Sequence, residues 1–377
     1  MIFVKKSEYG GGKMWDVIVI GGGPGGAMAA KKCAEENLKT LILEKKKLPR
    51  NKVCTGMIMS PMAQNTIKQE FGEIPMEVLT TPHSLIGIWC HLSRDESYKI
   101  RIEMPLTWRR DLDYWLIEKA RQAGAHVWER SKVTHITEKP EGYLIKLIQE
   151  NEEIEAKGKF IIGADGAGSI VRESLFPQLN VKYALGYQEC YKVDLGLDKN
   201  HWHLFLMPEF APSYFSIIHK EEFMLIDLAA RKKELKKLLL KQAHHTLEKT
   251  YGFEVEQKPL WHDACIEPVL YHELFSGSFL PAKGNGLLVG DAAGLLLPIS
   301  GEGIGAALKS GLLAADSVIE ANRKNHQASD IYLDQLRGLT SKLQELYSDA
   351  KKMFAQEDQN QRVSILKEAW EKALRLR

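Results

Sequence analysis

The sequence predicts an α/β fold in which a parallel sheet covered by helices is interrupted by a second, mainly β layer and followed by a helical C-terminus. Three observations carry this prediction. Two short apolar strands flank an Ala-rich helix near the start of the chain, which is the pattern of a βαβ unit. Glycines gather at predicted strand ends, since 19 of the 30 lie within residues 10–26, 163–168 and 284–311. Between the second and third windows, the chain is rich in short β-like segments.

Composition narrows the class of protein. The chain has 377 residues, 51 Lys plus Arg against 49 Asp plus Glu, and 44% apolar residues. This near-neutral balance argues against nucleic acid as a partner, because such binding requires clustered cations. The five cysteines form no CxxC pair, which favours a reducing cytoplasmic setting. No run approaches the length of about 18 apolar residues that a membrane span needs, so at most peripheral membrane contact is expected.

The N-terminal half contains the first set of predicted elements. Residues 1–14 read as a flexible tail with a Gly hinge. Residues 16–20 form a continuously apolar, β-branched strand of the kind buried on both faces. A helix follows over 24–37, with Pro24 in its first turn, and a second strand over 40–44. Further on, the apolar period predicts a helix over 108–124 that ends on glycine, then strands near 126–129, 133–137, 143–149 and 159–162.

The C-terminal half changes character. From 181 to about 262 the chain shows short strands, such as 203–207 and 215–219, and one charged helix around 231–250. A buried strand at 287–289 and a helix over 303–321 follow, and 331–377 is largely helical. The last segment has an amphipathic stripe, which we interpret as a packing face, although its basic end keeps a membrane-surface role open. The stripe consists of Leu336, Leu339, Leu343, Leu346 and Tyr347.

The first glycine window matches G-x-G-x-x-G between a buried strand and a helix. Gly21 permits a tight turn, Gly23 lets the backbone approach a diphosphate, and Gly26 lets helix and strand pack closely. The start of the helix, at Pro24 and Gly25, offers N–H groups and a positive dipole end to that diphosphate. Glu44, at the end of the second strand, can accept hydrogen bonds from a ribose. These features predict a dinucleotide site for FAD or NAD, because the carboxylate disfavours the 2′-phosphate of NADP.

The other two windows each place one aspartate among glycines at a strand end. Asp165 follows the strand near 159–162, and Asp291 follows the strand at 287–289. Either carboxylate could orient a ligand hydroxyl, or it could cap a helix or a turn. The residues alone leave both alternatives open.

Together, the three windows resemble those of the superfamily of FAD-dependent group A hydroxylases and geranylgeranyl reductases, whose fold is that of p-hydroxybenzoate hydroxylase. The family signatures are an N-terminal GxGxxG with an acid, a GADGxxSxVR motif, and a GDAAG motif followed by Pro and a Gly-rich helix start. Here they stand at residues 21–44, 163–172 and 290–305. The resemblance implies a Rossmann-like FAD-binding domain interrupted by a β-sheet substrate domain.

The resemblance also implies roles for single residues. Asp291 would bind the ribityl chain, and 301–304 would bring N–H groups to the pyrimidine end of the flavin, where a helix dipole stabilises the reduced ring. Arg109, four residues before Asp113, would contact FAD phosphate or ribityl. Asp165 would support FAD and transient contacts with NAD(P)H, the implied reductant. The implied cofactor-binding set is Gly21, Gly23, Pro24, Gly25, Gly26, Glu44, Cys54, Arg109, Asp165, Gly290, Asp291, Pro298, Gly301, Gly303 and Ile304.

Within the superfamily, the chain is most similar to the geranylgeranyl reductase branch. Residues 52–57 resemble its K-x-C-G-G segment beside the flavin, and 298–311 resemble its glycine-rich helix start. The branch's Y-x-W-x-F-P pocket strand is altered, because Trp is replaced by Ser216 and Pro by His219, which argues against a long prenyl substrate. Candidates for residues near the reacting atoms are Cys54, Tyr214 and His219.

The motifs predict a division of the chain into seven segments. They are a tail (1–14), FAD-binding parts (15–80, 106–180 and 281–330), substrate-domain parts (81–105 and 181–280), and C-terminal helices (331–377). The predicted function is that of an FAD-dependent oxidoreductase that reduces C=C bonds of a small apolar, isoprenoid-like substrate. The alternatives are a monooxygenase acting on an aromatic or polyketide substrate and a flavin-bound redox sensor or scaffold. No metal site is expected, and the oligomeric state is not predicted.

Overall fold

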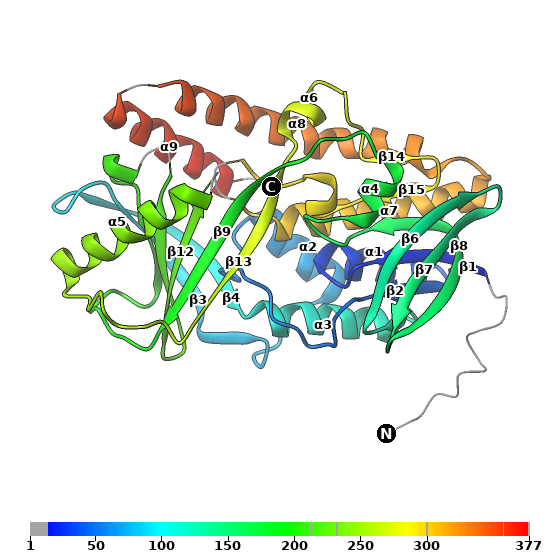
Figure 1. The fold of residues 1–377 in the computed structure, drawn as a ribbon, viewed down its shortest axis with the longest axis horizontal. Helices are drawn as coiled ribbons and strands as arrows, with labels where there is room; N and C mark the ends of the chain where they lie inside the picture. Colours follow the sequence, from blue (N-terminus) through cyan, green and yellow to red (C-terminus); the bar gives the residue numbers. More distant parts are fainter. Residues whose placement is uncertain (1–13, 211–212, 231–232, 299–300, 357, 376–377) are drawn as a thin grey trace.

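A computed structural model describes residues 14–210, 213–230, 233–298, 301–356 and 358–375 of the chain. Two sheets lie side by side, and long C-terminal helices run along both of them (Figure 1). The mixed α/β class predicted from the sequence is confirmed. Of the predicted tail, only Met14 belongs to the described residues, where it begins the first strand.

The first sheet has a parallel centre with the strand order β14-β15-β8-β1-β2-β5. Its central strand β1 (Met14–Ile20) pairs in parallel with β2 (Thr40–Leu43) on one side and with β8 (Glu152–Gly163) on the other. The β-branched run of β1 is buried on both faces, as its sequence predicts. The remaining strands are β5 (His126–Trp128), β6 (Ser131–Lys139), β7 (Gly142–Gln149), β14 (Ala282–Lys283) and β15 (Gly286–Leu288).

Helices pack against this sheet and against each other. The closest approach is between α1 (Pro24–Glu35) and α7 (Ile304–Lys324), where a Cβ atom on Gly311 would lie 2.3 Å from the Gly25 carbonyl oxygen. Only glycine permits this approach, so the first and third glycine windows are pressed together. The other helices of this half are α2 (Pro61–Phe71), α3 (Arg109–Gln122) and α4 (Ile170–Leu175).

The second sheet has the order β13-β9-β12-β11-β10-β3-β4. Its strands come from two stretches of chain, 79–107 and 182–269, which are separated by strands β5 to β8 of the first sheet. One face packs under helix α5 (Lys233–Tyr251), and the other carries a separate apolar cluster shared with α9 (Gln359–Leu374). The strands are β3 (Leu79–His91), β4 (Ser97–Thr107), β9 (Lys182–Tyr191), β10 (His201–Phe205), β11 (Phe215–Lys220), β12 (Phe223–Ala230) and β13 (Trp261–Val269).

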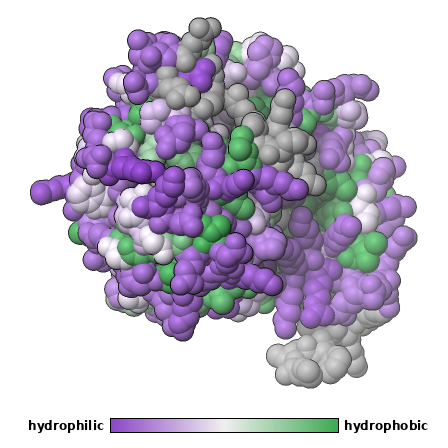
Figure 2. Space-filling model, turned by 60° about the vertical axis from the view of Figure 1, so that its left-hand side comes forward, coloured by the Kyte–Doolittle hydropathy of each residue, from purple (hydrophilic) through white to green (hydrophobic). Residues whose placement is uncertain are grey.

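The C-terminal stripe is a packing face. Leu336, Leu339, Leu343 and Leu346 on α8 (Ala328–Ala355) are at most 6% exposed and belong to the main core. Tyr347 stacks on Tyr271 of α6 (Tyr271–Phe275), with ring centroids 5.2 Å apart. On the face of the molecule shown in Figure 2, apolar residues form several separate patches among hydrophilic side chains. Such scattered exposed apolar residues are usual for a protein surface.

Candidate functional site

The glycine-rich turn after β1 contains two kinds of glycine: those that the fold requires and one that it does not. Gly21 has φ +103°, and a Cβ atom there would lie 2.3 Å from the Ala164 carbonyl oxygen. A Cβ atom on Gly26 would lie 2.0 Å from the Gly21 oxygen, whereas one on Gly23 would meet nothing closer than Arg50, at 3.9 Å. Gly21 and Gly26 therefore hold the turn against its neighbours, and Gly23 faces open space.

The N-terminus of α1 opens onto that space. Gly23 is its N-cap, with no side-chain hydrogen bond to the first turn, Pro24 follows, and no acidic side chain lies in the first turn. The backbone N–H groups at this end thus have no side-chain cap, and the helix dipole adds positive potential. This arrangement suits an anionic diphosphate.

Glu44 is 3% exposed and lies at the end of β2, beside the same turn. Its Oε2 accepts the Gly22 N–H at 3.0 Å, and its Oε1 accepts the Lys46 N–H at 2.9 Å. Each carboxylate oxygen can accept two hydrogen bonds, so Glu44 fixes the turn and retains acceptor capacity for a ribose hydroxyl.

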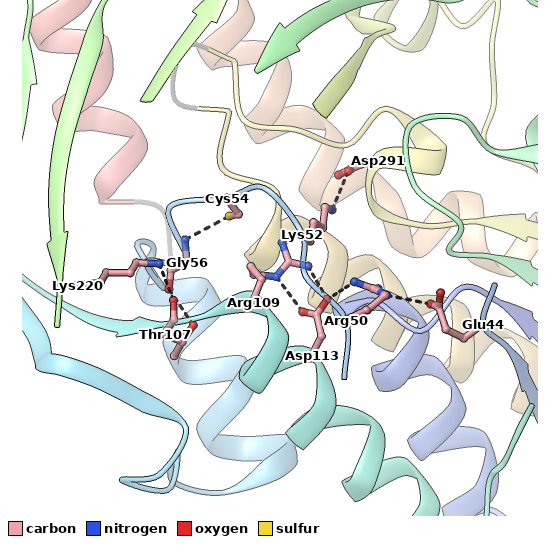
Figure 3. A network of polar contacts seen from close by, with 10 residues as sticks. All are labelled: Glu44, Arg50, Lys52, Cys54, Gly56, Thr107, Arg109, Asp113, Lys220 and Asp291. Carbon is pink, nitrogen blue, oxygen red and sulfur yellow. Dashed lines mark hydrogen bonds and ion pairs between the residues drawn. The ribbon is translucent and has the colours of Figure 1, made fainter. Parts of the chain in front are cut away.

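Arg50 links this carboxylate to a second buried ion pair (Figure 3). Its Nε lies 3.2 Å from Glu44 Oε2, and its Nη1 lies 3.1 Å from Asp113 Oδ2. Arg109 binds the same aspartate through two contacts of 2.8 and 3.0 Å. Burial acts to raise the pKa of Asp113, but Arg109 and Arg50 hold it below the usual value. Arg50 was not predicted from the sequence, although a basic residue shortly after Glu44 was a usable signal.

Asp165 performs the helix-capping role that the sequence left open. Its Oδ2 accepts the N–H groups of Ile170 and Val171 at 2.7 and 3.3 Å, at the start of α4. Its Oδ1 is buried, and no hydrogen-bond partner for this atom exists among the described residues. Burial raises the pKa of the carboxyl to about 6. A second acceptor atom therefore remains for a ligand next to the glycine turn, whose Gly21 packs against Asp165.

The third window forms the far wall of the site. Asp291 lies in the short helix η2 (Gly290–Ala293), and its Oδ2 is 3.5 Å from the Lys52 ammonium. A Cβ atom on Gly303, the N-cap of α7, would lie 3.2 Å from Asp291 Oδ1. Gly301 adopts φ +65° just before this helix start at Ile304. Pro298 precedes residues 299–300, which lie outside the described part of the chain.

The Cys54 segment meets the second sheet at a buried lysine. Cys54 Sγ accepts the Gly56 N–H at 3.3 Å, and a Cβ atom on Gly56 would lie 2.8 Å from Lys220 Nζ. Lys220 is fully buried and donates to the Thr107 carbonyl at 2.8 Å (Figure 3). Its ammonium group lies 4.3 Å from the centre of the Trp108 ring. Burial lowers the pKa of Lys220 to about 8. Lys220, which can lose its proton near neutral pH, therefore lies against the Cys54–Gly56 segment.

The two other candidates for the reacting centre lie on different sides of the second sheet. Tyr214, just before β11, packs 5.6 Å from the Trp370 ring of α9. His219 alternates with Lys220 along β11 and therefore points to the opposite face, the side of Phe215 and Ile217. The sheet lies between this imidazole and the Cys54 loop, and a place for His219 near the reacting atoms stays a prediction.

Glu267 on the edge strand β13 was missed by the sequence analysis. Its carboxylate oxygens lie 3.7 and 3.8 Å from the position of a Cβ atom on Gly301. Burial, with a further contribution from Asp291, raises the pKa of this carboxyl to about 7. A titratable group thus faces the loop at the start of α7.

These features pass a test of fit for FAD. An uncapped helix N-terminus, a glycine that faces open space, a carboxylate that can accept from a ribose, and a buried Asp165 oxygen without a partner among the described residues gather around the turn after β1. A protein-family model described as an FAD binding domain matches residues 14–185. Fold and site therefore define a flavoprotein, and the enzyme is an FAD-dependent oxidoreductase. The chain is similar to the superfamily of FAD-dependent hydroxylases and geranylgeranyl reductases.

Sequence relatives agree with the reductase branch. The chain is 29% identical over 326 residues to the digeranylgeranylglycerophospholipid reductase of Methanocaldococcus jannaschii, covering 83% of this chain and 78% of the relative. It is 27% identical over 333 residues to the geranylgeranyl diphosphate reductase of Rhodobacter capsulatus, covering 85% and 78%. Both alignments span FAD-binding and second-sheet segments, because each covers more than four fifths of this chain.

Solved structures show the same fold. A geranylgeranyl bacteriochlorophyll reductase-like protein from Thermoplasma acidophilum superimposes with a TM-score of 0.78 at 20% identity, over 95% of this chain and 92% of the other. A flavin-dependent brominase gives 0.73 at 15% identity, over 96% and 90%. Within the described residues, the helices include none with the length and apolarity to cross a membrane. The same residues contain no cluster of three or more His, Cys, Asp or Glu side chains suited to a metal ion.

Proposed function

We propose that this protein uses FAD to reduce carbon–carbon double bonds of an apolar, isoprenoid-like substrate. The observation that carries the proposal is that the residues assigned to FAD meet the second sheet where the Cys54–Gly56 segment lies against Lys220. Relatives named as geranylgeranyl reductases support the substrate class. When bound, FAD supplies hydride transfer, and the protein supplies orientation and electrostatics.

The chain's own residues hold the cofactor in a defined order. The α1 N-terminus and Arg50 bind the diphosphate, and Glu44 accepts from the adenosine ribose. Asp291 and the free oxygen of Asp165 orient the ribityl hydroxyls. The N-terminus of α7, at Gly303 and Ile304, would lie near the pyrimidine end of the ring and would stabilise negative charge there. Each assignment is testable by substitution.

Protons for the reaction come from groups at the junction of the two sheets. Lys220 and Glu267 have pKa values near neutrality, because burial disfavours the charged form of each. Groups with pKa values near the working pH are suited to proton transfer. We assign NAD(P)H as the reductant, with transient binding beside the same residues.

A monooxygenase is the second candidate function, and one observation favours it. Polar side chains, Asp227 and Gln188, lie in the face of the second sheet near Tyr214, and an aromatic hydroxylation substrate would need such groups. The two functions differ in their need for O₂.

The deciding experiment is reduction of the FAD-loaded protein with NADH or NADPH under argon, followed by addition of geranylgeraniol. Saturated product without O₂, detected by mass spectrometry, supports the reductase. Product that forms only in air and carries an added oxygen atom supports the monooxygenase. A protein that cannot be loaded with FAD contradicts both proposals.

A further inference from the structure

A polar row crosses the face of the second sheet that carries α9, a face that is mainly apolar apart from the buried Lys220. Three residues stand opposite each other on neighbouring strands, since Ser216 of β11 pairs with Asp227 of β12, and Asp227 pairs with Gln188 of β9. Directly paired residues project to the same face. The same line continues into the apolar cluster at Leu204 and Cys90. The polar row is therefore a local interruption of a hydrophobic surface.

Asp227 is only partly satisfied in this row. The Gln188 side-chain amide donates to its Oδ1 at 2.5 Å. Its Oδ2 is buried, and no hydrogen bond to this atom exists among the described residues. An unpaired buried acceptor is unfavourable because it has lost its hydrogen bonds to water, so such an atom in a native protein indicates a missing partner.

On one side of the polar row, helix α9 covers the face of the sheet, and on the other side the face is exposed to solvent. On the side of β10, Trp370 of α9 covers the sheet and contacts Trp202 and Tyr214, with centroid distances of 5.1 and 5.6 Å. On the other side, Ala229 is exposed on β12, two residues after Asp227 and on the same face. Beyond it, β13 places Glu267 beside Gly301. A ligand next to the flavin-facing loop can therefore reach the row from the open side.

We propose that Asp227, held by Gln188 and flanked by Ser216, binds a hydrogen-bond donor on the substrate, a hydroxyl or an amino group. The inference rests on the proposed function and narrows its substrate class from an apolar alkene to an alkene with a polar group. Selectivity arises because a bare hydrocarbon leaves Asp227 Oδ2 without a partner. Burial raises the pKa of Asp227 to about 7, with Gln188 and Lys220 opposing that rise. Both protonation states expose an oxygen that can accept a hydrogen bond.

The test compares three probes of equal chain length on FAD-loaded protein: geraniol, geranylamine and the hydrocarbon 2,6-dimethylocta-2,6-diene. Dissociation constants are measured by quenching of tryptophan fluorescence. We expect wild-type protein to bind geraniol or geranylamine at least about ten-fold more tightly than the hydrocarbon, the effect of one satisfied buried acceptor. A preference for the amine over the alcohol indicates an ionised Asp227, and the reverse order indicates a protonated one.

Three variants complete the design. Asp227→Leu removes the acceptor and should make the three constants equal, with hydrocarbon binding kept or improved. Asp227→Asn retains an acceptor oxygen and should keep part of the preference for geraniol, which separates a lost hydrogen bond from a misfolded sheet. Asp95→Asn changes an exposed carboxylate in the turn between β3 and β4 of the same sheet, and should match the wild type.

Equal affinities for all three probes in the wild-type protein overturn the inference, as does an unchanged preference in Asp227→Leu. Failure of all three probes to bind also overturns it. The proposed function fails separately, because alkene reduction under argon is scored in a different assay from binding. If the protein reduces both the hydrocarbon and geraniol, and binds them with equal affinity, the proposed function is supported and only the role of Asp227 is contradicted.

Discussion

Alanine at two glycines of the first turn should separate cofactor binding from folding. Gly23 has extended backbone angles, φ −86° and ψ −177°, which alanine adopts freely, and its added Cβ would stay 3.9 Å from the nearest atom. Alanine is a poorer N-cap residue than glycine, which destabilises the fold, but it also lowers the entropy of the unfolded chain, which stabilises the fold. Because the two effects oppose each other, the free energy of unfolding should change by less than about 1 kcal/mol. The methyl group instead enters the space assigned to the diphosphate.

The matched control is Gly26→Ala. Its Cβ would lie 2.0 Å from the Gly21 carbonyl oxygen, so the backbone must move, at a cost of about 3 kcal/mol or more. For Gly23→Ala, losing one charge-assisted hydrogen bond, worth about 1.5–3 kcal/mol, should weaken FAD binding by about 10- to 150-fold.

The assay has two parts, urea unfolding of the protein without FAD and titration with FAD followed by flavin fluorescence. We expect Gly23→Ala to unfold like the wild type and to bind FAD weakly, and Gly26→Ala to unfold at lower urea. Wild-type FAD affinity in Gly23→Ala would show that the diphosphate does not approach this glycine. Unchanged stability in Gly26→Ala would show that the close packing of the turn is not required.

Two further predictions concern titration. The visible spectrum of the FAD-loaded protein should titrate with an apparent pKa near 7, because the pKa of Glu267 is raised to about 7 beside Gly301. The Glu267→Gln variant should show no such titration. If the variant still titrates near pH 7, the titrating group is not Glu267. His219 is buried, and burial lowers its pKa to about 4. The folded pKa lies below the unfolded value of about 6.5, so stability is lost as pH falls from about 6.5 towards 4. The loss should reach about 2 kcal/mol between pH 7 and pH 5, and urea unfolding of His219→Gln should show a correspondingly smaller pH dependence; an equal dependence would rule out this histidine.

The features predictable from sequence are those with local causes. The turn glycines directly follow β1, and Glu44 lies at the end of β2, the strand that pairs with β1. Strand periodicity and nearness in the chain were therefore sufficient to predict that they lie together. The helix boundaries differ from the prediction by only a few residues, since α1 ends at Glu35 and α3 begins at Arg109. For Asp165, the sequence left two alternatives open, ligand binding and helix capping. The structure shows the capping contact, and the second carboxylate oxygen has no partner among the described residues.

The features that were missed depend on contacts between distant segments. Lys220 meets Gly56 from a position 164 residues later in the chain. Glu267 reaches Gly301 only because β13 is the edge strand of the second sheet. The period of a strand shows that His219 and Lys220 point to opposite faces, but it does not say which face meets the cofactor.

By itself, the sequence determined the α/β class, the dinucleotide turn and the resemblance to FAD-dependent enzymes, because each depends on short-range pattern and on glycines that tolerate no side chain. The tertiary structure alone decided which polar groups share the junction of the two sheets: Lys220, Glu267, and Asp227 with its unpaired oxygen. The physical reason is desolvation. Burial shifts a pKa or leaves an acceptor unsatisfied only after separate segments pack together and exclude water.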